Sequence, residues 1–313
     1  MLLTACTQDF QTDPVTSTSP TSTSPAGYTD PDSLSPTTPQ QTLTFLFFSD
    51  TQPDPELNDF TGVGGLLKQA VEHYTKPELI IFGGDTVNDG RDEAQWYEFW
   101  DAAGSSLDDL ITAAVSGNHD NDALLANQFD YPFEAPIRAD EGFFYTFTVG
   151  QVCFIMLDSN IMGAANPRDI EWLQNTLQSD IARNASWRIA VMHHPMWPVV
   201  DNPKDAQRAA IMREHFLPVL EKYNVDMILC GHQHVYTRTK PMLGDSAAEN
   251  IFGIVQIMVA SGDKESYTIG ERDFISASDT APNYVLLIAD SKSISGIVYN
   301  GENMVIDRFT IYK

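Results

Sequence analysis

Short apolar runs alternate with amphipathic stretches from residue 43 onward, and this alternation is typical of a layered α/β fold. The apolar runs predict strands at Leu43–Ser49, Leu79–Phe82, Ile111–Ser116, Phe143–Val149, Val152–Leu157, Arg188–Met192 and Met227–Cys230. Apolar residues at three-to-four spacing predict helices at Phe60–Tyr74, Glu93–Ala103, Arg168–Ile181 and Pro203–Tyr223. Beyond Ile254 the pattern changes to strands separated by Gly, Ser and Asp, the last at Asn303–Tyr312. No break in composition follows residue 42, so residues 42–313 are predicted to form one domain.

The first 41 residues lack this periodicity. Of the 35 residues from Thr7 to Gln41, 21 are Ser, Thr or Pro, and none is Lys or Arg. Such a composition cannot form a core, so residues 7–41 are predicted to be an extended, disordered linker.

Leu3-Thr4-Ala5-Cys6 directly precedes this linker and resembles a bacterial lipobox, where a signal peptide is cleaved and the cysteine receives a lipid. We expect residues 1–6 to be the remnant of a truncated signal peptide. The chain would then be a bacterial lipoprotein, extracellular or on the cell surface, that contacts the membrane only through Cys6. The alternative is that Cys6 is a free thiol near a frayed end.

The chain carries 43 acidic against 18 basic residues, a formal net charge of −25. A surface this acidic repels a phosphate backbone, so we expect no nucleic-acid partner. Nothing in the sequence specifies an oligomeric state. Cys153 and Cys230 lie inside apolar runs and are predicted to be buried and unpaired.

Five predicted strands end in polar residues, and ligands collect at such ends in α/β folds. These residues are, in chain order, Asp50 and Gln52, Asp85 and Asn88, Asn118 and His119, His193 and His194, and His232 and His234. Asp, Asn and His suit divalent cations, and five of the seven histidines fall in these segments. Period-two spacing on an extended segment would direct His232 and His234 to one side. A single motif of this kind is common in turns, whereas five in order predict a metal site.

These ordered motifs resemble those of the calcineurin-like metallophosphoesterase superfamily, from Thr44 to the end of the chain. The run from Gly231 to Arg238 is similar to that of purple acid phosphatases, and Asp307–Lys313 is similar to the last strand of bacterial members. The resemblance implies a four-layer α/β sandwich, in which two β-sheets are flanked by helices. It also implies hydrolysis of phosphate esters.

The resemblance implies two divalent metal ions, of Mn, Zn or Fe, about 3.5–4 Å apart. The first ion would be held by Asp50, Gln52, Asp85 and His234. Asp85 would bridge to the second ion, held also by Asn118, His193 and His232. Such a pair binds both an attacking hydroxide and the phosphoryl oxygens, while His119 would protonate the leaving group or contact the phosphoryl oxygens. Asn118 would contact substrate as well.

Two residues depart from the superfamily pattern. Gln52 stands where the superfamily usually has His, and its carbonyl oxygen would bind the first metal more weakly than imidazole. Asn88 stands where purple acid phosphatases have the Tyr that ligates iron, so we expect no purple colour. The side-chain carbonyl of Asn88 is expected to accept the hydrogen bond that orients the catalytic His119.

Several nearby residues have two interpretations. Trp197 follows a predicted ligand and is a candidate to line the substrate pocket, although packing is an equal alternative. Tyr236 and Arg238 follow the last ligand and are candidates to face the site. His194, next to a ligand, is interpreted as a supporting or structural residue.

The sequence therefore predicts a dinuclear-metal phosphoesterase that acts on small phosphate monoesters or diesters, with nucleotides among the candidates. One alternative is a nuclease-type phosphodiesterase of the same superfamily, which the acidic surface disfavours. The other alternative is a non-catalytic surface binding protein that has lost its first metal site because Gln52 replaces a histidine. The remaining ligands are intact, and this disfavours the second alternative.

Overall fold

The computed structural model describes residues 42–73, 77–129, 131, 142–248 and 252–313. The predictions for residues 1–6, for Cys6 and for the linker at residues 7–41 lie outside this part of the chain. Residues 40–313 form one compact unit. Within the described ranges, no helix combines the length and the apolar character needed to cross a membrane.

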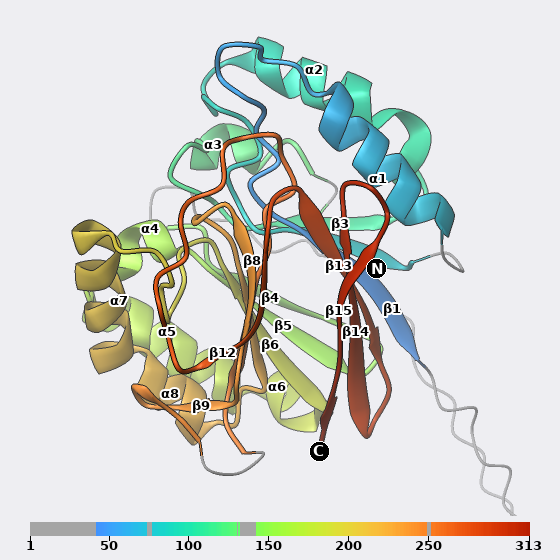
Figure 1. The fold of residues 1–313 in the computed structure, drawn as a ribbon. Coiled ribbons are helices and arrows are strands. Elements are labelled where there is room, and N and C mark those ends of the chain that lie inside the picture. The colour runs from blue at the N-terminus through green and yellow to red at the C-terminus, as the bar shows by residue number, and fades with distance from the viewer. Residues whose placement is uncertain (1–41, 74–76, 130, 132–141, 249–251) are drawn as a thin grey trace, which may run out of the picture. The chain divides into compact units, whose positions relative to one another are not determined.

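Two β-sheets form the centre of this unit (Figure 1). The first sheet has the order β15-β14-β13-β1-β2-β3, in which β1, β2 and β3 are parallel. Its strands are β1 (Leu43–Phe48), β2 (Leu79–Phe82), β3 (Ile111–Ala114), β13 (Asn283–Ala289), β14 (Ser293–Asn300) and β15 (Val305–Tyr312).

The second sheet has the order β12-β8-β11-β7-β6-β5-β4, in which β5, β6, β7 and β11 are parallel. Its strands are β4 (Tyr145–Val149), β5 (Val152–Leu157), β6 (Trp187–Met192), β7 (Met227–Cys230), β8 (Val235–Thr239), β11 (Val255–Met258) and β12 (Ile275–Thr280). A small separate sheet pairs β9 (Met242–Leu243) with β10 (Ser246–Ala247).

Helices cover the outer faces of both large sheets (Figure 1). The first sheet is covered by α1 (Thr61–His73) and α2 (Glu93–Ala103), followed by the 3-10 turn η1 (Gly104–Leu107) and the short α3 (Asp122–Leu125). The second sheet is covered by α4 (Ser159–Met162), α5 (Pro167–Gln178), α6 (Asp180–Asn184), α7 (Pro203–His215) and α8 (Leu217–Lys222).

The side chains of β5 show how the layers pack. Phe154 faces the first sheet, where its ring meets that of Phe45 edge to face at 5.3 Å. Ile155 points the other way, into the cluster that contains Leu173 of α5 and Met212 of α7. Because alternate residues of a strand point to opposite faces, a wholly apolar strand must be buried on both sides. The four-layer sandwich that the sequence predicted is therefore confirmed.

Most predicted elements are observed to within two residues at each end, and Cys153 and Cys230 are buried and free as predicted. Two predicted helices are wrong in extent because each is two helices. The backbone at Ser179 is extended, which separates α5 from α6. Pro218 has no N–H and would clash with the carbonyl four residues earlier, so α7 cannot continue and α8 starts anew.

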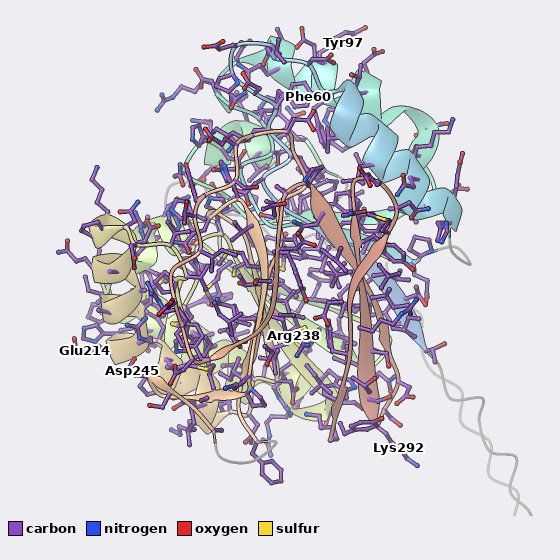
Figure 2. All side chains as sticks on the ribbon, in the orientation of Figure 1. Phe60, Tyr97, Glu214, Arg238, Asp245 and Lys292 are labelled. Atoms are coloured by element: carbon purple, nitrogen blue, oxygen red, sulfur yellow. The ribbon has the colours of Figure 1, made fainter. Side chains whose placement is uncertain are left out.

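The expectation that Tyr236 and Arg238 face the metal ligands is wrong, because both bind the far end of the chain. The Tyr236 hydroxyl donates to Asp307 Oδ2 at 2.6 Å, and the Arg238 guanidinium pairs with the same carboxylate at 2.7 Å. Since Tyr236 and Arg238 belong to β8 and Asp307 to β15, these bonds join the two large sheets. Arg238 is labelled in Figure 2.

We predict that Asp307→Ala lowers the free energy of unfolding by about 2 kcal/mol, since it leaves a buried hydroxyl and a half-buried guanidinium without their acceptor. Urea denaturation followed by circular dichroism measures this. The matched control is Arg308→Ala on the exposed side of the same strand, which should change the value by less than about 0.5 kcal/mol. Equal effects of the two variants would contradict the role of Asp307 in joining the two sheets.

Candidate metal centre

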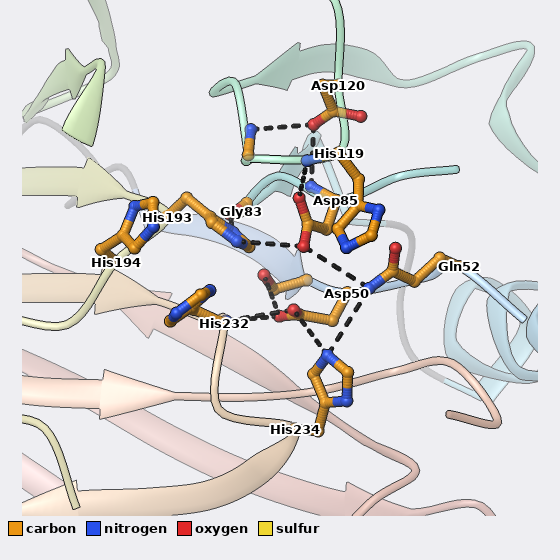
Figure 3. A network of polar contacts seen from close by, with 12 residues as sticks. Asp50, Gln52, Gly83, Asp85, His119, Asp120, His193, His194, His232 and His234 are labelled. Atoms are coloured by element: carbon orange, nitrogen blue, oxygen red, sulfur yellow. Dashed lines mark hydrogen bonds and ion pairs between the residues drawn. The ribbon is translucent and has the colours of Figure 1, made fainter. Parts of the chain in front are cut away.

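Six of the seven predicted ligands come together where parallel strands of both sheets end (Figure 3). The seventh, Asn118, has an exposed side chain that no contact among the described residues joins to this group, so its role as a metal ligand stays a prediction. Asp50 and Gln52 follow β1, Asp85 follows β2, and His119 follows β3. His193 follows β6, and the segment between β7 and β8 carries His232 and His234. The carboxyl ends of strands from two sheets thus meet at one place, as is common for ligand sites in α/β folds.

Asp85 lies at the centre of this group. Its Oδ2 is 3.2 Å from His193 Nε2, while His193 Nδ1 is 2.9 Å from the carbonyl oxygen of Gly83. Because Nδ1 must donate its proton to that carbonyl, a neutral His193 presents the lone pair of Nε2 to a carboxylate. Burial alone would lower the pKa of His193, but the charges of Asp85 and Asp50 raise it to about 9. This position therefore strongly attracts positive charge.

His232 completes a cluster with these two residues, in which all three candidate ligand atoms lie within 4.8 Å of one another. Its Nε2 is 3.0 Å from Asp205 Oδ1 on α7, so the other ring nitrogen is left to face the cluster. Burial would raise the pKa of Asp205, but its hydrogen bond to His232 and the charge of that ring hold it below the usual value. A carboxylate behind an imidazole is the usual arrangement that orients a histidine ligand.

A second group of donors lies on the other side of Asp85. His234 Nε2 is 3.5 Å from Asp50 Oδ1, and His234 Nδ1 is 3.2 Å from the carbonyl oxygen of Glu265. Burial lowers the pKa of His234, which keeps this imidazole neutral and able to bind a cation. The Gln52 amide nitrogen contacts Asp85 Oδ2 at 3.4 Å and His234 at 3.5 Å, while its buried oxygen has no hydrogen-bond partner.

His119 lies beside Asp85, as Figure 3 shows. Its backbone N–H donates to Asp85 Oδ1 at 2.8 Å, and its Nδ1 is 2.8 Å from the backbone carbonyl oxygen of Asn88. The predicted role of the Asn88 side chain is therefore wrong: the main chain orients His119. The Asn88 amide instead donates to the carbonyl of Pro53 at 3.0 Å.

Two predicted substrate contacts have different surroundings. Asn118 is exposed and lies between Gly117 and His119, next to the cluster in sequence. Trp197 is buried, and its indole N–H donates to the carbonyl of Gly244 at 3.0 Å. These contacts favour the packing interpretation of Trp197, because its polar atom and its ring are already used by the protein interior.

The backbone at the ligands is unusual. Among the described residues, eight other than glycine have positive φ, and four of these are predicted ligands: Asp50, Asp85, His232 and His234. The extended segment predicted for the two histidines is therefore wrong, although both still face the donor group. Positive φ costs free energy in residues with a Cβ, and such strain persists only where surrounding contacts impose it.

Two glycines let the loops approach one another. A Cβ at Gly117 would collide with Asp85 N and Oδ1, and a Cβ at Gly231 would collide with Ser49 Oγ and Asp50 Oδ2. These clashes explain physically why each motif pairs glycine with a ligand.

Sequence reasoning missed two residues of the site. Asp120 accepts from the backbone N–H groups of Asp85 at 2.8 Å, Gly117 at 2.9 Å and Thr86 at 3.1 Å, and so ties two ligand loops together. Its place directly after His119 was a usable signal. Asp205 lies on a helix that carries no motif. His194, interpreted from the sequence as a supporting or structural residue, lies beside the cluster, with its ring centroid 4.2 Å from that of His232.

Residues 43–236, more than half of the chain, match the model of the calcineurin-like phosphoesterase family. A probable purple acid phosphatase of Arabidopsis thaliana is 27% identical over 188 residues, covering 55% of this chain and 43% of that protein. A probable cyclic nucleotide phosphodiesterase of Moraxella catarrhalis is 30% identical over 188 residues, covering 56% and 64%. The chain thus spans less than two thirds of either relative. The structure of a purple acid phosphatase from yellow lupin has the same fold, with a TM-score of 0.69 and 18% identity over 87% of this chain and 54% of that one.

We predict that Asp205→Asn weakens Mn²⁺ binding about 10- to 100-fold. The carboxylate of Asp205 is a charged acceptor that holds the His232 ring in place, and a neutral amide would hold it less firmly. Competition with a fluorescent chelator measures the affinity. Asp201→Asn makes the same chemical change at an exposed carboxylate four residues earlier and should leave the affinity unchanged. Equal affinities of the two variants would show that Asp205 does not orient His232.

Proposed function

The chain belongs to the calcineurin-like phosphoesterase family, and from this premise we propose that it hydrolyses small phosphate esters with two divalent metal ions bound around Asp85. One observation carries the proposal. Asp85 Oδ2 faces an imidazole nitrogen of His193 at 3.2 Å, and that nitrogen has no hydrogen-bond partner although it is buried. A buried carboxylate and a buried imidazole lone pair directed at one another need positive charge between them, which a proton supplies in the metal-free protein and a divalent cation would supply in the loaded one.

The second group of donors supports a second ion. Asp50, Gln52 and His234 bring a carboxylate, an amide and a neutral imidazole to the other side of Asp85. A half-turn of the Gln52 amide would exchange its unpartnered oxygen with its nitrogen. The oxygen would then lie where the nitrogen now contacts Asp85 and His234. Oxygen and imidazole donors suit Mn²⁺, Zn²⁺ or iron, and the set contains no thiolate.

When bound, the ions would activate a water molecule and offset the charge of the phosphoryl group. Asp85 would lie between them, and Asp205 and Gly83 hold the rings of His232 and His193 in place. His119 donates Nδ1–H to the Asn88 carbonyl, which leaves Nε2 directed elsewhere. When the ring carries a proton on both nitrogens, Nε2 would give its proton to the leaving oxygen of the ester and return to the neutral form. Asn118, exposed beside it, is proposed to contact the phosphoryl oxygens.

The net charge of −25 supports small substrates, because this exterior repels a long polyanion, while cations held by buried donors would attract a single phosphate. The relatives include a phosphatase and a phosphodiesterase, so the proposal covers monoesters and diesters. Asp50, Asp85, His193, His232 and His234 lie in one group. A binding protein that had lost its metals would have no need of so many donors, which supports an enzyme over a binding protein.

We predict that Asp85→Asn removes the bound metal and lowers kcat/KM at least about 100-fold, because the ions supply several kcal/mol of transition-state stabilisation. The measurements are metal analysis and hydrolysis of p-nitrophenyl phosphate and its bis-ester with added Mn²⁺. Asp89→Asn, at a neighbouring exposed carboxylate, should retain both properties. Wild-type protein without bound metal and without turnover under every ion tried would overturn the proposal.

We also predict that Gln52→His tightens binding of the first metal, since imidazole is a stronger donor than an amide oxygen. Titration of the metal-free variant by calorimetry should resolve the change. The control is Gln178→His, at the exposed end of α5. An affinity equal to that of wild type would mean that Gln52 is not a ligand.

A further inference from the structure

The segment from Ser261 to Tyr267, which we term the cover loop, is fixed to the metal-binding loop after β1. Its Ser261 and Gly262 N–H groups donate to the carbonyls of Ser49 and Asp50, each at 2.8 Å. A Cβ at Gly262 would collide with the backbone oxygen of Gln52, so the two loops pack backbone to backbone. The cover loop therefore has a defined position relative to the donors.

Tyr267 is placed by this loop against a predicted ligand. Its ring stacks on His234 with 4.8 Å between centroids and 13° between planes. The tyrosine is nonetheless 49% exposed, so one ring face packs on the imidazole while much of the remainder is open to solvent. An exposed aromatic held flat against a ligand residue is an unusual use of apolar surface, and it leaves a ring face beside the site.

Lys264 belongs to the same loop and brings a positive charge to a strongly acidic chain. Its backbone lies between Gly262, whose N–H donates to the Asp50 carbonyl at 2.8 Å, and Glu265, whose carbonyl oxygen is 3.2 Å from His234 Nδ1. Burial lowers the pKa of Lys264. No ion pair holds its Nζ within the described part of the chain. A lysine held on this loop without an ion pair is available to an anionic ligand that binds beside it.

We propose that the cover loop selects substrates with a planar aromatic leaving group, such as an aryl group or a nucleobase, which stacks on Tyr267 while Lys264 contacts the phosphoryl oxygens. This inference rests on the proposed function, because it assigns the leaving-group end of the same site. Stacking on aromatic side chains tolerates any flat ring, so the loop would recognise a class of leaving groups and not one base.

Binding of two phosphonates that cannot be hydrolysed tests this directly, measured by calorimetry on the Mn²⁺-loaded protein. Wild type should bind phenylphosphonate about tenfold more tightly than methylphosphonate. Tyr267→Ala should bring the two affinities together by weakening phenylphosphonate alone, and Tyr267→Phe should restore the difference. Lys264→Gln should weaken both probes by a similar factor and keep their ratio.

The matched control is Tyr97→Ala, which removes an exposed tyrosine from α2, a helix that carries no predicted ligand; Figure 2 labels Tyr97. Metal analysis of each variant confirms that the ligands are intact. A ratio that survives Tyr267→Ala, or that is absent in wild type, overturns the inference. If wild type binds phenylphosphonate more tightly than methylphosphonate but hydrolyses no ester, only the hydrolase proposal is contradicted. If the protein hydrolyses esters but Tyr267→Ala leaves the ratio of the two affinities unchanged, only this inference is contradicted.

Discussion

The group of donor side chains between the two large sheets depends on one electrostatic constraint: its buried hydrogen-bond acceptors need positive charge. Asp85 faces an imidazole whose proton is already used by the Gly83 carbonyl, and Asp50 faces another whose Nδ1 is directed at the Glu265 carbonyl. A carboxylate and a neutral imidazole in contact cannot satisfy each other, because both offer lone pairs. Divalent cations satisfy several such groups at once, which explains why the fold can keep them together.

Holding these donor side chains together requires an unfavourable backbone conformation. Four predicted ligands adopt positive φ, a conformation that is unfavourable for residues with a Cβ. The loops are then held by contacts that reach across the chain: Asp120 joins the loops after β2 and β3, and the cover loop is bound to the loop after β1. The apolar layers on both sides of each sheet supply the rigid frame from which these loops extend. A site under strain is therefore compatible with a stable protein.

The sequence predicted the strands well because β2, β5 and β7 are apolar runs with polar residues at their ends, and burial on both faces leaves such a pattern. It predicted which donor side chains come together because each follows a strand. It failed where the responsible atom belongs to the backbone or to a distant segment. The main-chain carbonyl of Asn88 carries no residue-type signal, and Asp205 and Tyr267 reach the site from parts of the chain that carry no motif.

The central claim is that Asp85 is shared by two cations, one beside His193 and His232 and the other beside Asp50 and His234. A crystal of the protein soaked in Mn²⁺, with anomalous diffraction recorded near the manganese edge, tests this most directly. The account predicts two anomalous peaks about 3.5–4 Å apart, both in contact with the Asp85 carboxylate. A map without a peak at Asp85, or with Mn²⁺ bound only elsewhere, would contradict it.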